Sequence, residues 1–173
     1  MEDDDEEIGE IAPPGDSIAR VLSSWRMSRP DLPVDPIAVT ARLARLSVQV
    51  GTRIGQVFAA HGLTGPGFAV LATLVRLGGA PLSQRRLMAE LNLTAGTISV
   101  RIDRLVADGL VTRRPDPADG RGSLIELTRR GRSVFDACAP EHLANARDVL
   151  AGLDAEQQHQ LGYLLGLLLH SLE

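Results

Sequence analysis

The chain has 173 residues, enough for one or two compact units, and 44% of them are apolar, which suffices for a sizeable core. Aromatic residues make up only 3%, so a stacking platform for single-stranded nucleic acid is not expected. The one cysteine, Cys138, cannot form an internal disulfide. The acidic beginning is unlike a signal peptide, and no apolar run reaches the roughly 20 residues that span a bilayer, so we expect a soluble cytoplasmic protein.

The formal net charge of -4 is distributed unevenly along the chain. Residues 1–10 contain seven acidic side chains and no basic one, so the remainder carries about +3. Residues 83–132 alone contain ten arginines against six acids. We expect residues 1–15, which end in two prolines and a glycine, to form a disordered acidic leader. A leader that competes with nucleic acid for the basic segment is the alternative.

The first periodic segment is a short helix. Asp16 or Ser17 is its expected N-cap, and its apolar stripe, which includes Trp25, extends to about residue 27. The stretch RPDLPVDP then interrupts the helix with three prolines.

Two further helices follow this break. Apolar residues recur at three- and four-residue steps over residues 37–61, and Gly62 fits the C-cap of that helix. Thr64 is the expected N-cap of the next helix, which a glycine pair at 78–79 ends.

Residues 83–109 contain two short helices joined by a tight connection. Ser83 is the expected cap of the first, Thr94 is the cap of the second, and Gly109 ends the pair. The second helix turns an apolar face inward and presents the following residues on its opposite face: Thr97, Val100, Arg101 and Arg104. This pattern fits a helix-turn-helix, whose second helix enters the major groove of DNA. A plain helical pair is the alternative.

A β-hairpin is predicted directly after this pair. The strand-like residues 110–114 and 123–127 flank eight residues, 115–122, that are rich in proline, glycine and aspartate. A hairpin in this position is the wing of a winged helix. Thr128 then caps another helix, which we expect Pro140 to kink or end before a further helix reaches about residue 150.

The last predicted helix covers residues 154–172, with Asp154 and Gln157 spaced as a capping box. It is apolar over more than half of its girth, through Leu161, Leu164, Leu165, Leu168, Leu169 and Leu172, with Leu167 off this stripe. Burying one leucine stabilises by about 1.5–3 kcal/mol, so exposing several is costly. We expect a second subunit to cover them. Packing against the helix at 37–61 is the alternative.

The segment LTAGTISVRIDRLVADGLVTRRPDPADGRGSLIELTRRG resembles the winged-helix core of MarR-type transcriptional regulators. The matching marks are the RIDRL helix, ADGLVTRR running into a strand, DPADGR in the wing and LTRRG opening the next helix. GFAVLATLVRLGG is similar to the family's first winged-helix helix. The resemblance covers about residues 39–135 by motif, and the flanking helices by arrangement only.

The resemblance implies a mainly α fold with a small β-hairpin wing, in which a winged helix-turn-helix (62–135) lies between N-terminal (16–61) and C-terminal (136–173) dimerisation helices. The homodimer would place its 94–107 helices in the major groove and its wings along the minor groove of a near-palindromic operator. Regulators of this type usually repress and are released by a small ligand.

The resemblance also suggests roles for single residues. Arg121 near the wing tip would reach the minor groove, with Asp119 orienting its guanidinium. The caps of the two short helices would donate to phosphates, and of the two arginines at the hairpin base one would contact phosphate while the other pairs with an acid. Asp103 is expected to pair with an arginine. The expected DNA-binding residues are Ser83, Thr94, Thr97, Ser99, Val100, Arg101, Arg104, Arg113, Arg114, Asp119 and Arg121.

One subgroup of the family responds to urate, and this chain resembles it in Trp25, the proline-rich link, Arg101 and Arg113. Ala69 stands where that subgroup has an aspartate, so the resemblance does not imply urate. We expect a different anionic or aromatic effector at Trp25, Arg101 and Arg113. A packing role for Trp25 at a dimer interface is the alternative.

Other classes of function find little support in the sequence. No nucleophile–base pair, phosphate loop or G-x-G-x-x-G occurs, so neither an enzyme nor a cofactor is expected. The four histidines are scattered, and Cys138 has no second cysteine to resolve it. A redox- or metal-responsive regulator and a winged-helix module that binds another protein remain the alternatives.

Overall fold

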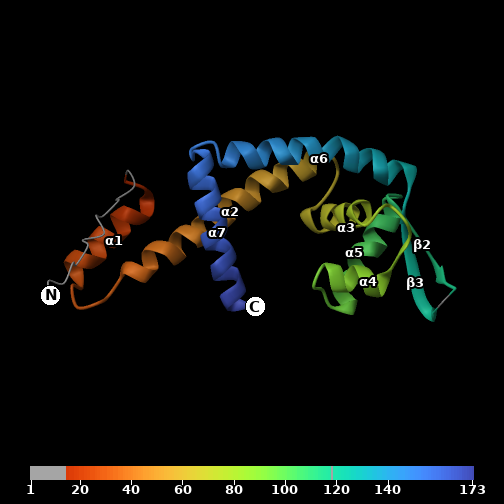
Figure 1. Ribbon diagram of the computed structural model, residues 1–173, viewed down its shortest axis with the longest axis horizontal. Helices are drawn as coiled ribbons and strands as arrows, with labels where there is room; N and C mark the ends of the chain where they lie inside the picture. Colours follow the sequence, from red (N-terminus) through yellow and green to blue (C-terminus); the bar gives the residue numbers. More distant parts are fainter. Residues whose placement is uncertain (1–14, 118) are drawn as a thin grey trace, which may run out of the picture. The chain divides into compact units, whose positions relative to one another are not determined.

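The computed structural model describes residues 15–117 and 119–173 (Figure 1). The predicted acidic leader therefore lies, apart from Gly15, outside the described residues. The chain divides into two compact units, residues 1–50 and 51–173. The fold is mostly helical with one small antiparallel sheet, which confirms the predicted class. Among the described residues no single helix is long and apolar enough to cross a membrane. Helices α2 and α3, bent by 73°, pass that test only when counted together.

The first unit contains α1 (Ser17–Ser28) and the beginning of α2 (Asp35–Ala60). Asp16 caps α1 as predicted, since its Oδ1 accepts from the Ala19 N–H at 2.7 Å. Its Oδ2 also accepts from Arg42 Nε at 2.7 Å, which ties the start of α1 to α2. This guanidinium holds the pKa of Asp16 below its ordinary value.

The second unit contains α3 (Gly65–Arg76), α4 (Gln84–Glu90), α5 (Ala95–Ala107), α6 (Arg129–Val149) and α7 (Ala155–Leu172). Each begins after a side chain that accepts from the backbone N–H three residues further on, which satisfies one of the N–H groups that a helix start leaves unpaired. These caps are the ones that the sequence predicts: Thr64, Ser83, Thr94, Thr128 and Asp154.

The sheet has three strands, β1 (Leu82–Ser83), β2 (Val111–Asp116) and β3 (Asp119–Leu127), in the order β1-β3-β2. The hairpin is longer than predicted, because only residues 117–118 separate β2 from β3. Pro115 is tolerated within β2 because β2 is an edge strand, where a missing N–H need not break a ladder. The sequence did not reveal β1, whose two residues are too short to show a periodicity.

Helix α6 does not end at Pro140, and the expected division into two helices is wrong. A proline inside a helix removes one hydrogen bond and costs about 3 kcal/mol or more. Packing on both sides of Pro140 offsets this cost. The Phe68 ring on α3 lies 5.5 Å from the Phe135 ring before the proline and 5.2 Å from the His142 ring after it.

The core of the second unit lies between α3, α4, α5, the sheet and α6 (Figure 1). Every large side chain in it that is less than 2% exposed is apolar: Val70, Leu71, Leu74, Leu87, Ile98, Ile102, Val111, Ile125 and Cys138. Helices α3, α4 and α6 contact β3, and α5 contacts β2, so all four pack on the sheet.

Helix α7 contributes nothing to this core. The predicted capping box is present, with Asp154 Oδ1 accepting from the Gln157 N–H at 2.8 Å and Gln157 Oε1 accepting from the Asp154 N–H at 3.0 Å. No residue of α7 is buried. Its exposed large apolar residues are Leu161, Tyr163, Leu164, Leu165, Leu167, Leu168, Leu169 and Leu172.

The first turn of α6 packs directly on the connection between α5 and β2. The Thr128 hydroxyl lies 2.8 Å from the Gly109 carbonyl oxygen and 3.1 Å from that of Leu110, and it accepts from the Gly131 N–H at 2.9 Å. A Cβ on Gly131 would overlap the Leu110 carbonyl. The LTRRG sequence therefore needs its glycine so that two backbones can approach each other.

We expect Gly131→Ala to lower the free energy of unfolding by about 2–3 kcal/mol, because the helix must shift away from Leu110. Gly96→Ala is the matched control, since a Cβ there meets nothing within 4 Å. The control should gain up to about 1 kcal/mol from better helix propensity. Urea denaturation followed by circular dichroism measures both, and equal midpoints for the two variants would contradict the close approach.

Candidate nucleic-acid interface

Helix α5 has the two faces that the sequence predicts. Ile98 and Ile102 are fully buried and Leu105 is 3% exposed, while Val100 on the opposite side is 70% exposed. Thr97 and Arg104 are also exposed, and Ser99 and Arg101 are half-buried. The buried face fixes α5 to the core, so the outward face is available to a groove of DNA.

Helices α4 and α5 are joined by residues 91–94, and Asn92 makes the turn with a φ of 49°. Ser83 Oγ accepts from the Arg86 N–H at 3.2 Å, and Thr94 Oγ1 accepts from the Thr97 N–H at 3.3 Å. A capping oxygen keeps its own O–H, which can still donate. The phosphate contacts expected of these two hydroxyls are compatible with their capping role and stay predictions.

Ion pairs at the base of the wing hold the hairpin. Arg113 Nη1 on β2 lies 2.7 Å from Asp103 Oδ1 on α5, so the expected arginine partner of Asp103 is confirmed. Arg114 Nε lies 3.7 Å from Glu126 Oε2 across the hairpin. Both basal arginines are therefore paired with acids, and a phosphate contact by one of them stays a prediction.

The tip of the wing begins with Asp119, the first residue of β3. Arg121 lies in the same strand, and its side chain is outside the described part of the structure. The roles expected of both residues at the minor groove therefore stay predictions.

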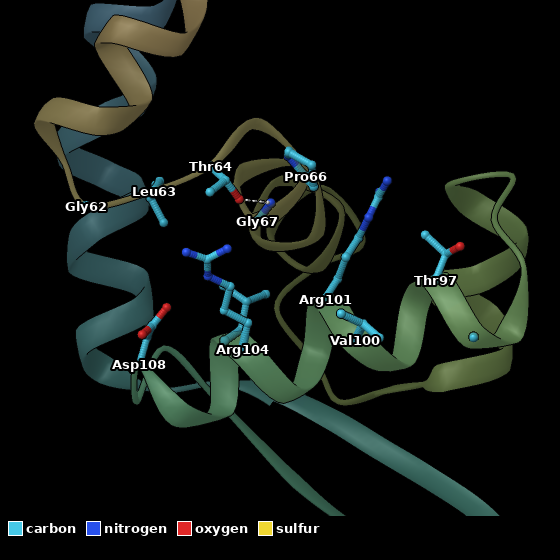
Figure 2. A pocket seen from close by; sticks show the side chains of 12 residues that line it. Gly62, Leu63, Thr64, Pro66, Gly67, Thr97, Val100, Arg101, Arg104 and Asp108 are labelled. Carbon is cyan, nitrogen blue, oxygen red and sulfur yellow. Dashed lines mark hydrogen bonds between the residues drawn. The ribbon is translucent and has the colours of Figure 1, made fainter.

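A pocket of about 680 Å³ opens beside α5 (Figure 2). Its walls are the α2–α3 connection with Leu63 and Thr64, the start of α3 at Pro66, and one side of α5. Figure 2 shows Arg104 extending from α5 toward Leu63 and Thr64, while Arg101 extends past Pro66, away from Arg104. Neither guanidinium forms an ion pair with another described residue.

The pocket has a positive character. Arg101 and Arg104 outnumber the one acid in its lining, Asp108, and the start of α3 adds the partial positive charge of a helix N-terminus. Of the three residues expected to hold an effector, only Arg101 lines this pocket. Trp25 belongs to the first unit, and Arg113 is paired with Asp103. The sequence did not predict that residues 62–67 line a pocket, because their helix-capping pattern is the same as that of a turn with a purely structural role.

The Cys138 thiol is unsuited to redox sensing. It is fully buried, and burial, followed by the nearby Glu141 charge, raises its pKa. A protonated, inaccessible thiol reacts slowly with oxidants, and the structure gives no support to the redox-responsive alternative.

We expect iodoacetamide to alkylate Cys138 at least about 100-fold more slowly in the folded protein than in denaturant, because reaction requires local opening. Whole-protein mass spectrometry follows the reaction without interference, since this is the only cysteine. Comparable rates in the two conditions would show that the thiol is accessible.

A helix-turn-helix with a buried inner face, an exposed outer face on α5 and an adjoining hairpin define a winged helix-turn-helix protein. Residues 61–122 match the model of the MarR family. The transcriptional regulator PecS of Dickeya dadantii is 34% identical over 151 residues, which cover 86% of this chain and 90% of that protein. This chain belongs to the MarR family, as a DNA-binding transcriptional regulator and not an enzyme.

Two solved structures add to this comparison. A mutant of MarR from E. coli in complex with operator DNA is 25% identical, with a TM-score of 0.69 over 80% of this chain and 99% of that one. PcaV from Streptomyces coelicolor in complex with its natural ligand is 27% identical, with a TM-score of 0.63 over 80% of this chain and 94% of that one.

Proposed function

We propose that the protein is a homodimeric, ligand-responsive repressor that binds a near-palindromic operator. The observation that carries this proposal is the geometry of α5, which is anchored by Ile98, Ile102 and Leu105 and exposed on its opposite face. The same helix is joined through the Asp103–Arg113 pair to the β2–β3 hairpin. The related MarR structure was solved in complex with operator DNA, which supports DNA binding by this fold. In the proposed complex α5 enters the major groove and the wing lies along the minor groove.

The proposed dimer rests on α7. Its apolar residues are not covered by the described part of the chain. Each leucine that is buried at a subunit interface would stabilise the dimer by about 1.5–3 kcal/mol. A two-fold dimer presents two copies of α5, which is why the operator should contain two inverted half-sites.

The proposed effector is an anion that binds the pocket between α3 and α5. Two arginines without acidic partners and a helix N-terminus favour a negative group there. PcaV, solved with its natural ligand, supports a ligand-bound state in a relative. Because Arg101 and Arg104 belong to the recognition helix, an anion on them would change the charge beside the DNA and weaken binding. Trp25 stays a predicted contributor from α1.

We expect gel shifts with duplexes from the region upstream of its own gene to show binding that weakens by about a thousandfold between ~50 mM and ~200 mM salt, because neutralised phosphates release counterions. Arg121→Ala should weaken binding about tenfold and reduce the salt slope by about one. Arg20→Ala, which removes an exposed arginine of α1, is the matched control and should change neither. A folded dimer that shifts no duplex at low salt would refute the DNA-binding proposal. If Arg121→Ala binds DNA with unchanged affinity, the proposed contact of the wing with DNA is wrong.

We expect benzoate, a simple aromatic anion, to raise the thermal midpoint of the protein, while neutral benzamide at the same concentration does so less, because only the anion pairs with the pocket arginines. Arg101→Ala should lose the difference between the two compounds. Asp108→Asn, which removes the acidic group of the lining, should increase it. Equal shifts for benzoate and benzamide in the unmodified protein would contradict an anion site.

A further inference from the structure

Val100 is an apolar side chain in an unusual place. Among the described residues from α3 to β3, the exposed large apolar residues are Val100, at 70%, and Val106, at 39%. The others lie on α1, on the link after it, on α2, or at the C-terminal helices α6 and α7 and the turn between them. Val100 is thus separate from the surfaces that a second subunit is expected to cover.

The surroundings of Val100 suit contact with the floor of a groove. Helical spacing places Gly96, Val100 and Asp103 on one stripe of α5, opposite the buried face. A Cβ on Gly96 would meet nothing within 4 Å, so no side chain one turn before Val100 holds the helix away from a base pair. Thr97 and Ser99, which flank this stripe in the first turns of α5, are small.

The guanidinium of Arg113 lies at the Asp103 end of this stripe, where it is paired with the carboxylate. In Figure 2 the side chains of Arg101 and Arg104 leave α5 in directions other than that of Val100, and the carboxylate of Asp103 is neutralised by Arg113 at 2.7 Å. The edge of guanine is read by arginine or lysine, whereas an apolar side chain matches the one apolar group in the major groove, the C5-methyl of thymine. The stripe therefore has the chemistry to recognise a methyl group rather than a guanine.

We propose that Val100 is a specificity-determining residue that contacts the C5-methyl group of a thymine in each half-site. This inference rests on the proposed insertion of α5 into the major groove. It adds a preference for thymine at one position of each half-site, which the helix-turn-helix arrangement alone does not specify.

The test uses the full-length protein and a duplex that it selects from a random pool. Each thymine of that duplex is replaced singly by deoxyuridine, which removes only the methyl group and keeps the base pairing. We expect one position in each half-site at which the replacement raises Kd about fourfold, the value for one methyl withdrawn from an apolar contact. Restoring a methyl there as 5-methylcytosine opposite guanine, compared with unmethylated cytosine, should recover affinity if the methyl alone is recognised.

The Val100→Ala variant completes a double-mutant cycle with the deoxyuridine replacement, because it removes the protein side of the same contact. This variant should bind the thymine duplex about as weakly as the unmodified protein binds the deoxyuridine duplex, and it should no longer distinguish the two. Val106→Ala on the same helix is the matched control and should retain the discrimination. Circular dichroism and molecular mass in solution establish that both variants remain folded and keep the same assembly.

The outcomes separate this inference from the proposed function. Binding that is indifferent to every thymine methyl, or discrimination that persists in Val100→Ala, would overturn the role of Val100 and leave DNA binding intact. If Val100→Ala changes the response to benzoate while methyl discrimination persists, Val100 belongs to the pocket at whose lining it lies, and the inference is overturned. Failure to select any duplex would overturn the proposed function and this inference together.

Discussion

The relation between the recognition helix and the wing depends on one backbone contact, at the start of α6. Thr128 bonds to the carbonyl oxygens that follow α5 and at the same time caps α6 through the Gly131 N–H. The absence of a side chain on Gly131 lets α6 lie against Leu110, the residue immediately before β2. The Asp103–Arg113 ion pair joins α5 to β2 from the other direction. Because α5 and the hairpin are held at both points, their spacing is fixed, as joint contact with DNA under the proposed function requires.

Helix α5 also combines three roles: it packs into the core, lines the pocket and carries the exposed Val100. One side holds the core through Ile98 and Ile102, and the other side carries Val100, which is 70% exposed and lines the same pocket as Arg101 and Arg104. Neighbouring residues of a helix point about 100° apart, so the side chains of Val100 and Arg101 leave α5 in different directions although both line the pocket. Under the proposed function, an anion in the pocket would act on the recognition helix directly. No long pathway through the protein is then needed to couple effector and operator.

Much of this arrangement was predictable because its signals are local. The caps Asp16, Thr64, Ser83, Thr94 and Thr128 were each predicted from a polar side chain before an apolar periodic run, and all are present. Gly62 and Gly109 end helices with positive φ values of 68° and 67°, a conformation that glycine adopts without strain. The two faces of α5 followed from the 3.6-residue period alone. The predicted Asp103–arginine pair was right in kind, although its partner was identified only by the structure.

The sequence by itself determined the class of fold, the helix N-caps and the side of α5 that is exposed, since each depends on residues a few positions apart. Only the tertiary structure decided that α6 continues through Pro140, because the rings of Phe135 and His142 gain contacts with Phe68, which lies about 70 residues away in the chain. The same holds for β1, which exists only through its pairing with β3, and for the pocket formed by α5 with the start of α3. These features depend on free energies of contact between distant segments, and no local pattern of residues records them.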